Sequence, residues 1–336
     1  MQSVFIHSFP RPDAQCPLTT LDFILKYGLL LTPEIISIQS EDDSCPSTVR
    51  RGKALALQRR FCLTLLDDDL THLLEHGNKF GKFHIQLSFE DTRKKLGAIP
   101  VFYVANSFKG QLDFDAIGYT LIHRLADVQY ILYYLDEIET FVNDTSCENE
   151  HFQFRDTLNA NLWFQRKELD ALLKEIMKKN QTNVSMKDLK NWMKYLSNFF
   201  VPTEYKGEEI DICNINSKHP YLEYYNQNEW RILGDMALDE KPLARALESS
   251  EKSDFLRLNH SFFSESLKKG KEKPIRIDEC RIINQTIDKQ PVRELIEKVY
   301  VPKSDKPEVY EILEKYGMTD CLHEYEIKTF QKIIIT

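Results

Sequence analysis

The chain has 336 residues, 42% of them hydrophobic, which is enough for one large domain or two ordinary ones with a real core. Its 44 basic and 52 acidic side chains leave a net charge of -8, which excludes a protein that grips nucleic acid with its whole surface. Seven scattered cysteines without a C-x-x-C pair predict reduced thiols. There is no charged and then apolar leader and no run of roughly 18 to 20 apolar residues, so we expect a cytoplasmic protein outside the membrane.

The N-terminal part of the chain alternates short strands and helices. Residues 3–9 form an apolar run broken by prolines, which predicts a strand with His7 towards its end. Residues 19–30 combine a hydroxyl cap, helical apolar spacing and Gly28, and they predict a short helix. Residues 60–65 predict a second strand.

Two features between residues 41 and 105 carry candidate site residues. Residues 41–52 predict an exposed loop that leads into the basic side chains of Arg50 and Arg51. Residues 97–105 are rich in β-branched and aromatic side chains, which predicts a buried strand. Tyr103 on this strand either packs in the core, as most buried tyrosines do, or points to a site.

A possible metal motif lies in a helix predicted for residues 67–76. The run from His72 to His76 matches the H-x-x-E-H pattern of zinc peptidases. Two imidazoles four residues apart on one helical face can hold zinc, with the acid beside a bound water. Because no third ligand stands out downstream, a surface helix is the preferred interpretation, and a zinc metallopeptidase is an alternative.

The middle of the chain is predicted to be helical. Apolar residues recur at helical spacing from 117 to 142, which predicts a long buried helix, and further helices are expected over 158–179 and 185–199. A charged, weakly periodic region follows from 241 to 273. Residues 306–316 predict a late helix, after which an apolar strand ends the chain.

An aromatic run over residues 221–233 is the stretch around which the chain is organised. Trp230 and Ile232 alternate with Glu229 and Arg231, which predicts a strand with apolar bulk on its inward face and the two charged residues on the other. Taken alone, Glu229 is interpreted as a solvated residue paired with its neighbour. A catalytic role needs support from elsewhere in the chain.

Together these elements predict an α+β protein. We expect a mixed, mainly antiparallel sheet assembled from both ends of the sequence, with a helical block in the middle. The predicted divisions are residues 1–116 for the N-terminal half of the core, 117–200 for a helical insertion or supporting layer, and 201–336 for the C-terminal half.

Short apolar and aromatic segments in a fixed order extend over most of the chain. They are His7 with residues 21–30, residues 61–63, residues 79–83 leading into 100–104, residues 224–232, and residues 299–302. In this order they resemble the AbiGi-type abortive-infection proteins of bacteria, which act in phage resistance. The resemblance implies antiphage defence, with the chain as an antitoxin-like regulator of a partner nucleotidyltransferase toxin.

A more distant resemblance rests on His7 at a strand end, the strand that bears Tyr103, and the late Glu229. These residues resemble the spaced histidine, aromatic and glutamate of ADP-ribosyltransferases, including the DarT-like toxins that modify DNA. The resemblance implies a sheet of that type, NAD as cofactor, and transfer of ADP-ribose to a nucleic acid or protein. Glu229 would stabilise the oxocarbenium-like charge, His7 and Tyr103 would hold the dinucleotide, and Arg50 or Arg51 would bind its pyrophosphate.

Two main functions therefore stay open beside the peptidase. The leading one is an NAD-dependent transferase in phage defence, and the alternative is an inactive regulator that keeps the fold and binds a partner toxin. The transferase hypothesis requires that His7 and Glu229 line one cleft. It involves no metal ligand.

Overall fold

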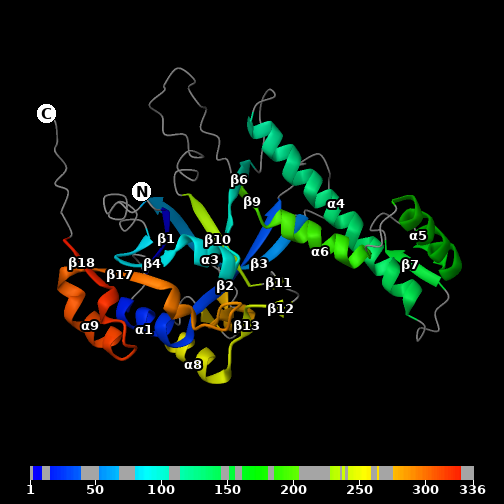
Figure 1. Cartoon of the computed structure of the whole chain (residues 1–336). Helices are drawn as coiled ribbons and strands as arrows, with labels where there is room; N and C mark the ends of the chain where they lie inside the picture. The colour runs from blue at the N-terminus through cyan, green and yellow to red at the C-terminus, as the bar shows by residue number, and fades with distance from the viewer. Residues whose placement is uncertain are drawn as a thin grey trace, which may run out of the picture. The chain divides into compact units, whose positions relative to one another are not determined.

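The computed structural model describes the chain in thirteen segments. They are residues 3–9, 16–38, 53–67, 80–105, 114–144, 151–155, 161–180, 185–203, 228–234, 237–238, 241–258, 263–264 and 275–326. The chain divides into two compact units (Figure 1). Unit 1 contains residues 1–34, 57–102 and 209–336, and unit 2 contains residues 35–56 and 103–208.

A mixed, mainly antiparallel sheet of ten strands forms the centre of the fold among the described residues. The strand order is β13-β16-β2-β3-β1-β4-β17-β18, and β10 pairs with both β3 and β5. The strands β17 and β18 run parallel, whereas β1 pairs antiparallel with β3 and with β4. The bounds are β1 (Ser3–Phe9), β2 (Leu29–Ile38), β3 (Lys53–Asp67), β4 (Phe83–Ser88), β5 (Ile99–Pro100), β10 (Glu229–Leu233), β13 (Arg245–Ala246), β16 (Arg281–Ile283), β17 (Ile296–Pro302) and β18 (Leu322–Tyr325).

Three helices supply the main core of unit 1: α1 (Pro17–Tyr27), α3 (Phe89–Leu96) and α9 (Lys306–Glu314). Their buried aliphatic side chains pack with alternate residues of β1, β3, β4 and β10. Each fully buried Leu, Ile or Phe in this core contributes about 1.5–3 kcal/mol relative to exposure. The members of this core on β1, β3 and β10 are Phe5, Phe9, Phe61, Leu63 and Ile232.

Gly28 connects α1 to β2 in a conformation that other residues avoid. Its φ is +101°, and a Cβ atom built there would lie 2.1 Å from the carbonyl oxygen of Ile283. Glycine has no Cβ and reaches positive φ without strain. The helix therefore ends at Tyr27, and the close approach to β16 is possible only with glycine.

Smaller elements complete unit 1. The helix α8 (Ser249–Leu258) packs a second cluster of apolar residues that includes Phe255, Ile277 and Ile282. The remaining short elements are β11 (Ala237–Leu238), β12 (Lys241–Pro242), β14 (Phe263–Ser264), β15 (Ile275–Arg276), η1 (Ile277–Glu279), η2 (Val292–Leu295), η3 (Lys303–Asp305) and η4 (Thr319–Cys321).

Unit 2 is mainly helical. The long helix α4 (Phe114–Asn143) packs against α5 (Arg166–Asn180) and α6 (Met186–Ser197). Two sheets of two strands each accompany these helices. One is formed by β6 (Phe102–Ala105) and β9 (Phe200–Thr203), and the other by β7 (His151–Arg155) and β8 (Asn161–Gln165). The described helices of the chain include none with the length and apolar character needed to cross a membrane.

The structure confirms the predicted α+β class and the mixed, mainly antiparallel sheet. It also confirms the strand over residues 3–9 and the helical middle of the chain. The helix predicted to begin at residue 158 is wrong at its start, because residues 161–165 form β8 and pair with β7. Aromatic residues in this stretch suit a pleated, half-buried surface, and the helix begins only at Arg166.

Candidate functional site

The strand β10 separates its residues onto the two faces of the sheet, as the sequence predicts. Trp230 and Ile232 face the main core, and Glu229 and Arg231 point to the other face. In the antiparallel pairing with β3, Glu229 lies opposite Thr64 and Arg231 lies opposite Cys62. Because paired residues share a face, one polar surface extends across both strands.

Arg231 is the centre of this polar surface. Only 3% of it is exposed, and its Nε donates a 2.8 Å hydrogen bond to Glu229 Oε1. Its Nη1 donates a 2.8 Å hydrogen bond to Gln58 Oε1 and lies 3.7 Å from Glu34 Oε2. Arg60 forms an ion pair with Glu34 and donates from Nε to Cys62 Sγ at 3.3 Å. We call Glu34, Gln58, Arg60, Cys62, Glu229 and Arg231 the polar network.

The two arginines and two glutamates of the polar network leave it with no net formal charge. Burial lowers the pKa of Arg60, and burial raises the pKa of the Cys62 thiol although the nearby guanidinium acts in the opposite direction. A raised pKa keeps the thiol protonated near neutral pH, which makes Cys62 a poor nucleophile. The Glu229 side chain is 14% exposed, so its expected interpretation as a solvated residue is wrong, although its pairing with a neighbour is right.

His7 lies on the other face of the same sheet. Ile6 of β1 pairs with Thr64 of β3, and Glu229 of β10 pairs with that same Thr64 on its other side. The side chains of Ile6, Thr64 and Glu229 therefore share one face, and His7, one residue further along β1, points to the opposite one. Ring contacts agree with this placement, since the His7 ring lies 4.0 Å from the ring of Phe61, a core residue.

The expectation that His7 and Glu229 line one cleft is thus wrong, because the packed strands separate the two side chains. His7 instead donates from Nδ1 to the carbonyl oxygen of Cys62 at 2.8 Å, within the sheet. Phe5, on the same face of β1 as His7, contacts Trp230 with ring centroids 5.2 Å apart. Because Trp230 and Glu229 point to opposite faces of β10, this contact independently places His7 on the face away from Glu229. An active site that needs both side chains on one dinucleotide is not formed by these strands.

The other predicted site residues have different positions. Tyr103 lies on β6 in unit 2, is 5% exposed and belongs to a different unit from His7 and Glu229. Arg50 and Arg51 lie outside the described residues, as does the zinc-peptidase run from His72 to His76. Within the described segments, no three histidine, cysteine or acidic side chains gather as a metal site would require.

Sequence reasoning did not select the β3 members of the polar network. Gln58, Arg60, Cys62 and Thr64 alternate with the apolar Phe61 and Leu63 at period two, which is the signal of a strand with one polar and one apolar face. Five of these six residues lie inside the strand predicted over residues 60–65, so the alternation is visible in the sequence, and only Gln58 lies outside that range. The observed β3 extends from Lys53 to Asp67.

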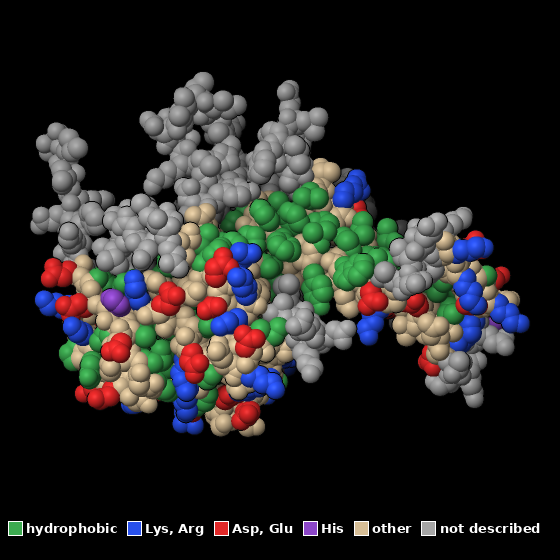
Figure 2. Space-filling view, in the orientation of Figure 1, with side chains coloured by type: hydrophobic (Ala, Val, Ile, Leu, Met, Phe, Trp, Pro, Cys, Tyr) green, Lys and Arg blue, Asp and Glu red, His purple; other side chains and the backbone are tan. Residues whose placement is uncertain are grey.

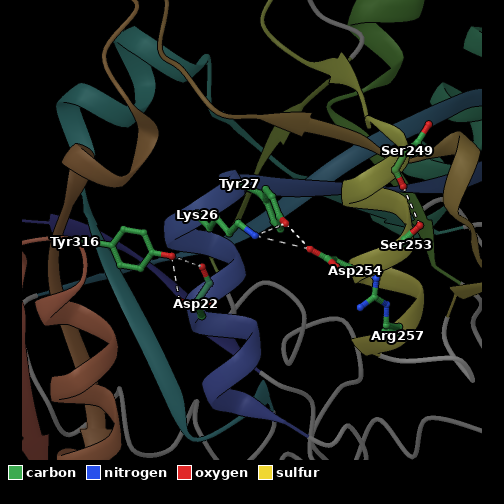
Figure 3. Close-up of polar contacts among 8 residues, drawn as sticks. All are labelled: Asp22, Lys26, Tyr27, Ser249, Ser253, Asp254, Arg257 and Tyr316. Carbon is green, nitrogen blue, oxygen red and sulfur yellow. Dashed lines mark hydrogen bonds and ion pairs between the residues drawn. The ribbon is translucent and has the colours of Figure 1, made fainter.

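A second group of polar contacts joins α1 to α8 and to the turn that follows α9 (Figure 3). The Tyr27 hydroxyl donates a hydrogen bond to the Asp254 carboxylate, and Lys26 Nζ donates one to the Tyr27 hydroxyl oxygen at 2.6 Å. In the turn that follows α9, Tyr316 donates to Asp22 Oδ1 at 3.0 Å, and burial together with that carboxylate raises the pKa of Tyr316 to about 12. Both phenols stay protonated near neutral pH, so these contacts hold helices together and offer no nucleophile.

Comparisons of the chain with protein-family models, with curated proteins and with solved structures find no match.

Proposed function

We propose that this chain is a non-catalytic, partner-binding regulator of the abortive-infection type, and that its partner is a protein toxin. The observation that carries the proposal is the aromatic and aliphatic surface of unit 2. Trp192 and Leu196 lie one helical turn apart on α6 and are 56% and 45% exposed. Figure 2 shows hydrophobic side chains gathered in the region of α4 and α6. Exposed apolar patches of this kind mark interaction sites, and tryptophan is enriched among the residues that dominate binding energy.

The polar network supports a non-catalytic role. A catalytic carboxylate has to face the reacting atoms, whereas Glu229 accepts a hydrogen bond from the buried Arg231 within a self-neutralised group. The NAD-dependent transferase and an ADP-ribosyltransferase-like sheet stay untested predictions. The placement of His7 and Glu229 on opposite faces of the sheet does not support either of these two predictions.

Expression of the chain by itself distinguishes a regulator from a transferase. We expect normal growth of cells that express either the natural chain or Glu229→Gln, and no consumption of NAD by the purified protein. An active transferase would be toxic in its natural form and harmless as Glu229→Gln. That pair of results, together with NAD turnover that the substitution removes, would refute the proposal.

Co-expression with a toxin tests the partner and the surface together. The probe is a nucleotidyltransferase toxin of the class that the resemblance implies, expressed at a level that stops growth. We expect the chain to restore growth and Trp192→Ala with Leu196→Ala to lose this rescue. Tyr310→Ala is the matched control, because Tyr310 is equally exposed but lies on α9 in unit 1. Rescue by the α6 variant would exclude α6 as the binding surface.

A further inference from the structure

We draw no further inference here: the strongest candidate, the exposed apolar surface patch on α4 that contains Leu121, Val128 and Ile131, carries none, because nothing in the structure shows what covers it.

Discussion

Removing the central cation of the polar network should cost much more than removing an arginine from the surface. In Arg231→Met, Glu229 loses its 2.8 Å hydrogen bond and ion pair, and the 2%-exposed Gln58 loses a second 2.8 Å hydrogen bond. Breaking a buried ion pair by removing one member costs roughly 3–5 kcal/mol, because the remaining charge stays buried. Partial exposure of Glu34 and Glu229 lets water screen part of this, so we expect about 3 kcal/mol.

The assay is urea unfolding followed by the fluorescence of Trp230. The chain has three tryptophans, and replacing Trp163 and Trp192 by phenylalanine leaves Trp230 as the reporter of unit 1. Trp230 packs against Phe5 and Phe89, so its emission changes when the sheet opens. A lower urea midpoint with an unchanged slope gives the loss of stability directly.

Arg124→Met is the matched control. Arg124 also forms an ion pair, with Asp127 at 3.1 Å, but its side chain is 76% exposed. Exposed pairs of this kind contribute about 0.2–1 kcal/mol, so the control should lose less than about 1 kcal/mol. Adding Glu229→Gln to Arg231→Met removes the carboxylate that has lost its arginine and should recover part of the loss. The reasoning is refuted if Arg231→Met and Arg124→Met lower the unfolding free energy equally.

Two further predictions concern local structure and pH. Gly28→Ala should destabilise the chain by more than about 3 kcal/mol in the same urea assay, because the added Cβ would lie 2.1 Å from the Ile283 carbonyl oxygen. Gly317→Ala is the control, since Gly317 has a φ of +68° and a Cβ there would have nothing within 4 Å. It should cost only about 1 kcal/mol of backbone strain. The bidentate bond from Arg245 to Glu251, at 2.7 and 2.8 Å, lowers the pKa of that carboxyl below its ordinary 4.5. Because the pKa of Glu251 is lower in the folded state, its ionised carboxylate stabilises the fold above pH 4.5, and this stability is lost as pH falls through the pKa of the folded state. The difference in unfolding free energy between the natural chain and Glu251→Gln should therefore shrink on acidification. A difference that grows towards low pH would contradict the ion pair between Arg245 and Glu251.

The sequence predicts the elements of this fold better than their partners. Helical spacing in residues 117–142 and alternation in residues 229–233 are local properties, and both elements form. The prediction that the long helix is buried is wrong, because Leu121, Val128 and Ile131 are 40%, 41% and 57% exposed. Residues 161–165 form a strand because β7 pairs with them, and that pairing is not visible in a local pattern. The sequence pattern does not predict the strand β2, because its apolar residues directly follow Gly28 and continue the composition of the preceding helix.

The polar network shows a similar limit at the level of the site. That Glu229 and Arg231 share a face follows from their spacing, and the structure confirms it. That Gln58 and Glu34 complete the group depends on which strands are neighbours. Arg231 and Gln58 are 173 residues apart in sequence, and they meet because β10 lies next to β3 in the sheet. The local sequence around either residue does not reveal this order of strands.

The separation of His7 from Glu229 turns on a single residue of register. Both β1 and β10 pair with β3, and Ile6 and Glu229 meet it at the same Thr64. Because side chains alternate faces at period two, a shift of β1 by one residue would bring His7 to the face of Glu229 and move Phe5 and Phe9 out of the core. Both of these phenylalanines are less than 5% exposed, so burial of their rings fixes the register. The same hydrophobic packing that forms the sheet thereby keeps the imidazole and the carboxylate apart.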